Sequence, residues 1–144
     1  TVLLPERNPE RFVDWTDEER RVFFGLQDRP LTLLVRAREP LQHLAQDGRI
    51  GIRTPDHPFT RELVTLLPFP ITATSANVSA KAPACTVTDL EALAKEVRLY
   101  AVDGGSLVRC LPSTVAAWEK GQWRIVREGE VTKQELEETV AASP

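Results

Sequence analysis

Helix-start signals alternate with short strand-like runs along this chain, and this alternation limits its fold more than any other feature. Three capping boxes of the form Thr-x-x-Glu begin at Thr16, Thr88 and Thr132, each ahead of apolar residues at helical spacing. Pro58 marks a fourth helix, because proline favours the first helical position. Seven runs have strand patterns, at residues 2–4, 31–35, 49–53, 71–74, 99–102, 114–118 and 123–126. Strands mixed with helices throughout predict an α/β or α+β fold, a twisted mixed sheet with flanking helices.

The apolar spacing also predicts which side chains these helices bury. The helix after Thr88 has an apolar stripe on one face, formed by Leu90, Leu93, Ala94 and Val97. The helix that begins at Pro58 is expected to bury Phe59, Leu63 and Leu66. Before the last helix, Val131 is placed to pack against Leu136 as a hydrophobic staple.

Composition excludes several classes of protein. The chain has 144 residues, 42% apolar and 27% charged, which indicates one folded domain rather than a disordered chain. No apolar run approaches the length that spans a membrane, and the net charge of −3 gives no general nucleic-acid footprint. Cys85 and Cys110 have no metal-ligand spacing, so a reduced cytoplasm is the expected location. With His43 and His57 as the two histidines, neither a metal site nor a histidine-based triad is predicted.

Polar side chains gather directly after the apolar strand pattern at residues 71–74. They are Thr72, Thr74, Ser75, Asn77 and Ser79. In open α/β sheets ligands bind beyond the carboxyl ends of strands, and these groups can bond a ribose, a phosphate or an amino-acid head group. An ordinary polar turn has the same composition, so the residues alone leave both interpretations open.

Two arginines end strand patterns and are candidate anion-binding groups. Arg53 closes the run at 49–53, on the face opposite Ile50 and Ile52, and Arg127 follows the run at 123–126. The planar guanidinium fork matches carboxylate and phosphate oxygens. The alternatives are a solvated strand end for Arg53 and an exposed edge strand for Arg127. Arg53 is expected to be functional if it meets the polar turn at 74–79 in space.

Five landmarks follow one another in an order that resembles the C-terminal part of the YrdC-like threonylcarbamoyl-AMP synthase family. They are Pro30-Leu31-Thr32-Leu33-Leu34; the element at 50–58 that contains Arg-x-Pro-x-His-Pro; the signature at 70–79 that ends in Thr-Ser-Ala-Asn-Val-Ser; Asp103-Gly104-Gly105 with Pro112-Ser113-Thr114-Val115; and Val126-Arg127-Glu128-Gly129. Together they cover nearly all of the chain. The resemblance implies a YrdC-like fold.

The resemblance also implies an activity. Family enzymes are L-threonylcarbamoyladenylate synthases, nucleotidyltransferases that join L-threonine, bicarbonate and ATP, with Mg²⁺ carried by ATP. Partner proteins then transfer the threonylcarbamoyl group to tRNA, so the expected partners are L-threonine, ATP, tRNA and those transfer proteins. Arg53, Ser75 and Ser113 match threonine-binding positions. Arg49, Asn77, Thr86 and Arg127 match ATP-binding positions, and no catalytic nucleophile is implied.

The chain departs from the family pattern in places. Ala80 stands where the family usually has glycine, and Asp28-Arg29-Pro30 replaces the usual Pro-Gly-Pro. The chain has no methionine, begins with a strand pattern and lacks the family's N-terminal strands and basic ATP motif. Either an N-terminal part is missing, or an initiator methionine was removed before a small residue. If a part is missing, we expect an impaired enzyme with an exposed, self-associating sheet edge at residues 2–4.

Two other functions stay open at this point. One is a non-catalytic YrdC-like paralogue that binds RNA or nucleotide through a basic concave surface. The other is a carbamoyl-transfer domain of the hydrogenase-maturation type. Arg53 disfavours the second, because the corresponding element of those domains usually lacks arginine.

Overall fold

The computed structural model describes residues 1–4, 8–55, 57–77, 83–106 and 112–142. Contacts divide the chain into two compact units. Unit 1 combines Thr1–Ala73 with Pro112–Pro144, and unit 2 is Thr74–Leu111. The predicted Ser79, Ala80 and Cys110 lie outside the described residues.

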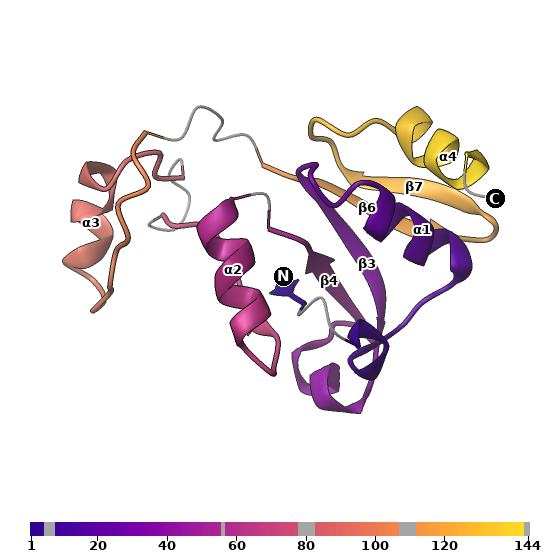
Figure 1. Cartoon of the computed structure of the whole chain (residues 1–144), viewed down its shortest axis with the longest axis horizontal. Coiled ribbons are helices and arrows are strands. Elements are labelled where there is room, and N and C mark those ends of the chain that lie inside the picture. Colours follow the sequence, from indigo (N-terminus) through magenta and orange to yellow (C-terminus); the bar gives the residue numbers. More distant parts are fainter. Residues whose placement is uncertain (5–7, 56, 78–82, 107–111, 143–144) are drawn as a thin grey trace. The chain divides into compact units, whose positions relative to one another are not determined.

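A twisted mixed sheet forms the centre of unit 1 (Figure 1). Its strand order is β5-β1-β4-β3-β6-β7, and β2 pairs with β3. β1 is parallel to β4 and β3 to β6, whereas the other pairs are antiparallel. The strands are β1 Val2–Leu3, β2 Val13–Asp14, β3 Leu31–Ala37, β4 Arg49–Arg53, β5 Ile71–Thr72, β6 Thr114–Glu119 and β7 Gln122–Arg127. The sheet confirms the predicted fold class.

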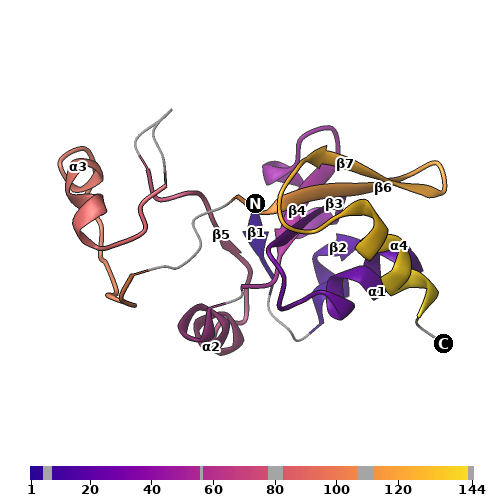
Figure 2. The same ribbon diagram turned by 90° about the horizontal axis from the view of Figure 1, so that it is seen from above.

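Three α-helices of unit 1 lie on one side of this sheet (Figure 2). They are α1 Asp17–Gly25, α2 Pro58–Leu66 and α4 Lys133–Ala141, and short 3-10 helices span Pro9–Arg11 and Glu39–Leu44. The capping boxes at Thr16 and Thr132 are both present, with reciprocal hydrogen bonds to Glu19 and Glu135. The main core lies between α1, α4 and the sheet and includes Val22, Leu33, Ile52, Trp123, Val131 and Leu136.

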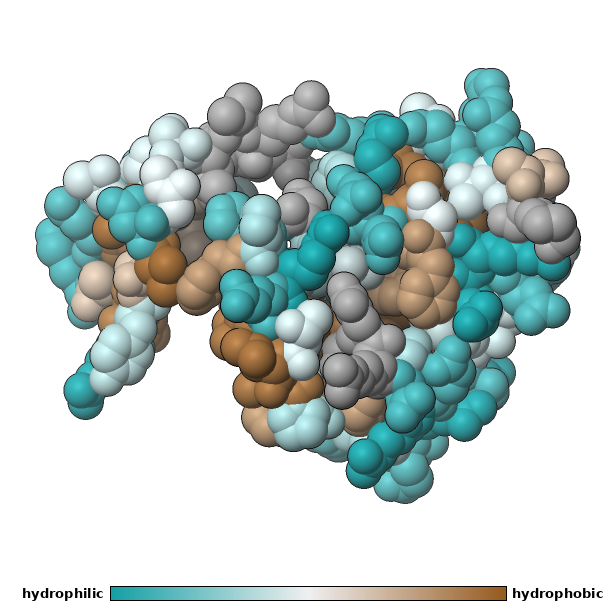
Figure 3. Space-filling view, viewed as in Figure 1, coloured by the Kyte–Doolittle hydropathy of each residue, from teal (hydrophilic) through white to brown (hydrophobic). Residues whose placement is uncertain are grey.

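Two predictions about unit 1 are wrong. Phe59, Leu63 and Leu66 of α2 are 47%, 38% and 74% exposed, and Val64 is the buried residue of this helix. The other apolar side chains of α2 stay partly exposed, and Figure 3 shows the resulting apolar surface over α2. The strand at residues 2–4 is not an edge either, because β1 lies between β4 and β5 and the Ala73 N–H donates to the Thr1 carbonyl at 2.9 Å.

Unit 2 has little regular structure among its described residues. A 3-10 turn at Thr88–Leu90 leads into α3 Glu91–Ala94. The capping box predicted at Thr88 is wrong: Asp89 accepts hydrogen bonds from the Cys85 and Thr86 backbone N–H groups, and the Thr86 hydroxyl accepts from the Asp89 N–H. The cap therefore begins two residues earlier, because Asp89 can reach the exposed N–H groups of that turn.

The strand predicted at residues 99–102 is also wrong, since that described segment has no strand. None of the described residues of unit 2 is buried, and Val97 of the predicted apolar stripe is 51% exposed. Without a neighbouring strand, an apolar run cannot form a sheet ladder. Cys85 is disulfide-bonded, which the sequence did not predict. Across the described residues, no helix is both long and apolar enough to cross a membrane.

Candidate functional site

The sheet of unit 1 has a second face, opposite α1, α2 and α4, which we call the open face. Ile50 and Ile52 of β4 are buried toward the helices, so strand alternation turns Arg49, Gly51 and Arg53 to the open face. Gly51 makes room there: a Cβ at this position would lie 3.1 Å from the Thr32 Cγ2 and 3.5 Å from the Thr1 Oγ1.

Strand register brings polar residues to one end of the open face. Leu33 pairs with Ile52, so Thr32 lies beside Arg53 one residue further along. Leu31 pairs with Thr114, which sets Ser113 at the same end, and Val115 pairs with Arg127. We call this group the polar end; it consists of Thr32, Arg53, Ser113 and Arg127. Three predicted site residues, Arg53, Ser113 and Arg127, thus come together although they are far apart in sequence.

Ser113 is the centre of the polar end. Its hydroxyl lies 2.8 Å from the Thr32 hydroxyl and accepts a hydrogen bond from Arg127 Nη2 at 3.1 Å. Its carbonyl accepts from Arg127 Nε at 3.1 Å and from Nη2 at 2.7 Å. Thr32 and Ser113 are both buried, so the contact between their hydroxyls is shielded from water, whereas Arg127 is exposed. The residue predicted for threonine and one predicted for ATP therefore touch directly.

The main chain around Ser113 is fixed from outside the sheet. The Thr114 hydroxyl donates to the Val131 carbonyl and accepts from the Val131 N–H, both at 2.9 Å. Gly129 packs so closely that a Cβ there would lie 2.8 Å from the Ser113 carbonyl carbon and overlap the Thr114 backbone nitrogen. A side chain at position 129 would therefore displace Ser113.

The opposite end of the open face holds Arg49. Arg49 Nη1 lies 3.5 Å from the Glu119 carboxylate, which also accepts two hydrogen bonds from Arg124 at 2.8 and 3.0 Å. These Arg124 bonds lower the pKa of Glu119, and the charge of Arg49 adds to the effect. Arg49 and Arg53 are four positions apart along the strand, which is roughly 13 Å. The structure therefore does not bring Arg49 to the polar end.

The other predicted site residues belong to unit 2. Asn77 donates its N–H to the Ser75 carbonyl at 3.1 Å, which makes a tight turn at 75–77. Thr86 caps the short helix through Asp89. Unit 2 is joined to unit 1 at Ala73, beside Thr1, and at Pro112, next to Ser113. That Ser75, Asn77 and Thr86 meet the polar end stays a prediction.

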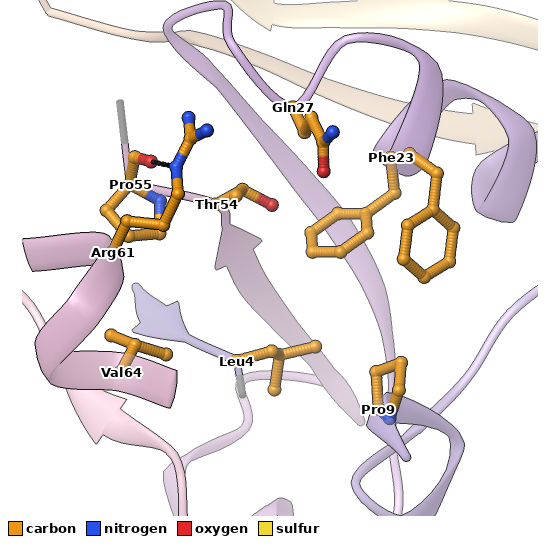
Figure 4. Close-up of a pocket in the computed structure, with 9 residues that line it drawn as sticks. Leu4, Pro9, Phe23, Gln27, Thr54, Pro55, Arg61 and Val64 are labelled. Atoms are coloured by element: carbon orange, nitrogen blue, oxygen red, sulfur yellow. Dashed lines mark hydrogen bonds between the residues drawn. The ribbon is translucent and has the colours of Figure 1, made fainter. Parts of the chain in front are cut away.

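A separate hollow lies on the helix side of unit 1 and was not predicted (Figure 4). Its lining is mainly apolar, and Arg61 at its rim donates to the Pro55 carbonyl at 3.3 Å and to Asp28 at 2.6 Å. No residue of the polar end lines it. The full lining is Leu4, Pro9, Phe23, Phe24, Gln27, Thr54, Pro55, Arg61 and Val64.

Sequence reasoning missed Thr32 as a member of the site. The available signal was a hydroxyl residue inside the apolar run at 31–35, because a buried polar group needs a partner. Among the residues that the structure describes, no group of three or more His, Cys, Asp or Glu side chains could hold a metal ion. His57 is exposed and precedes α2 without a side-chain capping bond.

Comparison with known proteins shows the family to which this chain is related. The family model Sua5/YciO/YrdC, described as "Telomere recombination", matches residues 6–129. A threonylcarbamoyl-AMP synthase of Dichelobacter nodosus is 30% identical over 121 residues, which are 83% of this chain and 57% of the relative. The chain spans 57% to 65% of the length of the curated relatives that match most of it.

Solved structures show the same fold. P. abyssi Sua5 complexed with L-threonine superposes with a TM-score of 0.80 at 21% identity, over 96% of this chain and 42% of Sua5. Full-length HypF in a phosphate- and nucleotide-bound form superposes with a TM-score of 0.75 at 22% identity, over 90% of this chain and 21% of HypF. At these identities the likeness establishes the fold.

Proposed function

Because the chain belongs to the Sua5/YciO/YrdC family, we propose that it forms part of an L-threonylcarbamoyladenylate synthase. Such an enzyme joins L-threonine, bicarbonate and ATP and releases pyrophosphate. The observation that carries the proposal is the polar end, where Ser113 and Arg127 are hydrogen-bonded to each other beside Arg53. The related synthase of D. nodosus and the threonine complex of P. abyssi Sua5 support it.

Each member of the polar end has a role in this proposal. The half-buried Arg53 holds the threonine carboxylate through two charge-assisted hydrogen bonds, and the Ser113 hydroxyl donates to the same substrate. Arg127 keeps its Nη1 group for a phosphate oxygen of ATP, because Nε and Nη2 bond Ser113. The chemistry then depends on positioning and charge stabilisation, so no covalent nucleophile is needed.

Unit 2 and the cofactors complete the proposal. Ser75 would contact threonine, and Asn77 and Thr86 would contact ATP. Mg²⁺ would be held mostly by the ATP phosphates. The product would pass to partner proteins that modify tRNA, and such an enzyme would work in the cytoplasm.

A second candidate is a non-catalytic paralogue that binds RNA or nucleotide. The observation that favours it is the charge of the open face. Although the chain has a net charge of −3, register places five arginines on this face with two carboxylates among them, Asp14 and Glu119. The arginines are Arg36, Arg49, Arg53, Arg124 and Arg127. A basic face of this kind attracts polyanions. Binding of RNA without threonine-dependent activity would identify this function.

The test of the main proposal is Arg53→Ala in the full gene product, with Arg36→Ala as the matched control. Arg36 is an exposed arginine of the same face at the opposite end of β3. Loss of one partner of a desolvated charge pair costs about 2–5 kcal/mol, so the apparent threonine affinity should fall at least tenfold. The measurement is ATP–pyrophosphate exchange that depends on threonine and bicarbonate. An Arg53→Ala enzyme with wild-type threonine affinity would refute the proposal.

A further inference from the structure

The main chain of Ser113 is held in place, but its side chain can still rotate and change the direction of the hydroxyl. The main chain of Ser113 is held by the close packing of Gly129 and by the paired hydrogen bonds between Thr114 and Val131. Rotation about the Cα–Cβ bond would still move the hydroxyl. Its direction therefore depends on its two side-chain partners, Thr32 and Arg127.

Thr32 is the more rigid of these two partners. It is 3% exposed in the middle of the sheet, whereas Arg127 belongs to the exposed residues. The Thr32 methyl group occupies the space that Gly51 leaves open, 3.1 Å from where a Cβ would stand. Branching at Cβ restricts the rotamers of such a side chain. Its hydroxyl is thereby aimed at Ser113, 2.8 Å away.

The hydrogen-bonding capacity of a hydroxyl group explains the role of the contact between Thr32 and Ser113. A serine hydroxyl has one proton to donate and two lone pairs that accept. Arg127 Nη2 donates to one lone pair of Ser113. When Thr32 donates to the other, both lone pairs are satisfied and the Ser113 proton is directed to a third group. An anionic ligand on the open face supplies such an acceptor.

We propose that Thr32 is a positioning residue that holds the Ser113 hydroxyl in one rotamer and leaves its proton for an oxygen of the bound substrate. This inference rests on the proposed function and deepens it, since Ser113 is there the threonine-binding hydroxyl. Gly51 contributes to this positioning, because it makes room for the Thr32 side chain.

A matched pair of variants tests the role without any ligand. Thr32→Val keeps the shape but removes the hydroxyl, and Thr32→Ser keeps the hydroxyl but removes the methyl group. Three-bond couplings of Ser113 are measured by NMR on the 144-residue chain. Wild type and Thr32→Ser should show one Ser113 rotamer, and Thr32→Val an average of rotamers. A single rotamer in Thr32→Val would overturn the proposal.

Substrate binding gives the second measurement, on the full gene product. Loss of one neutral hydrogen bond should raise the dissociation constant of L-threonine about three- to tenfold in Thr32→Val, while that of ATP stays unchanged. Thr32→Ser should restore threonine affinity. Equal losses in both variants, or equal losses for threonine and ATP, would overturn the proposal in favour of a packing role. A wild type that does not bind threonine would refute the proposed function instead, and the Ser113 couplings would still decide the role of Thr32.

Discussion

The two units of this chain use the same local chemistry with different results. In unit 1, threonine caps begin α1 and α4, which are each nine residues long and pack on the sheet. In unit 2, the cap made by Thr86 and Asp89 begins a 3-10 turn and an α-helix of four residues. None of the described residues around α3 is buried. A cap thus selects where a helix begins, whereas tertiary packing decides how far it continues.

The largest difference between the units is expected from truncation of apolar side chains. Leu136 of α4 is fully buried, and Val97 of unit 2 is 51% exposed. Leu136→Ala should lower the free energy of unfolding by about 2–5 kcal/mol, because it removes buried methyl groups and leaves a cavity. Val97→Ala should change it by less than about 0.5 kcal/mol. Urea unfolding followed by tryptophan fluorescence measures both, and similar losses would mean that unit 2 has a core of its own.

Removal of a helix cap should also affect stability differently in the two units, but the difference should be smaller than for the core substitutions. Thr16→Ala breaks the capping box of α1 and should cost about 1 kcal/mol of global stability. Thr86→Ala removes the hydroxyl that accepts the Asp89 N–H, in a unit that is not part of the core. We expect faster amide exchange at Asp89 with an unchanged unfolding midpoint. A lowered midpoint in Thr86→Ala would show that the two units unfold together.

The smallest expected effect is a difference in pH dependence between two capping carboxyls. Burial raises the pKa of Glu19 above its ordinary value of 4.5, and the Thr16 N–H and Arg49 offset this only in part. The folded protein therefore holds this proton more tightly than the unfolded chain does, so this carboxyl lowers stability as the pH rises through 4.5 to its folded pKa. Glu19→Gln keeps the capping box and should make stability less dependent on pH in that window.

Asp89 behaves in the opposite sense. Hydrogen bonds from the Cys85 and Thr86 backbone N–H groups lower its pKa below the ordinary 3.8. Its cap is complete above that value and is lost as the pH falls through the folded pKa. Urea unfolding of wild type and Glu19→Gln between pH 4 and pH 7 measures the Glu19 effect. Amide exchange at Cys85, followed as the pH is lowered below 3.8, reports on Asp89. Identical slopes for wild type and Glu19→Gln would contradict the role of burial at Glu19.

Local patterns predicted the helix starts well and helix burial poorly. The boxes at Thr16 and Thr132 are visible in the sequence because a cap bonds residues only three positions apart. The box at Thr88 has the same pattern, yet Thr86 and Asp89 form the cap. For α2 the apolar residues were identified, but the buried residue is Val64 and not Leu66. Burial depends on what lies opposite a helix, and spacing along one helix does not contain that information.

For the candidate site, too, some features could be predicted from the sequence and others depended on the tertiary structure. By itself, the sequence determined the family, the mixed sheet and the chemical groups at Arg53, Ser113 and Arg127. Only the tertiary structure decided that these three groups meet, that Arg49 lies at the other end of the open face, and that Thr32 bonds Ser113. Thr32 and Ser113 are 81 positions apart. Their contact arises from the parallel register of β3 and β6, which depends on the packing of the whole sheet against its helices and not on any local pattern.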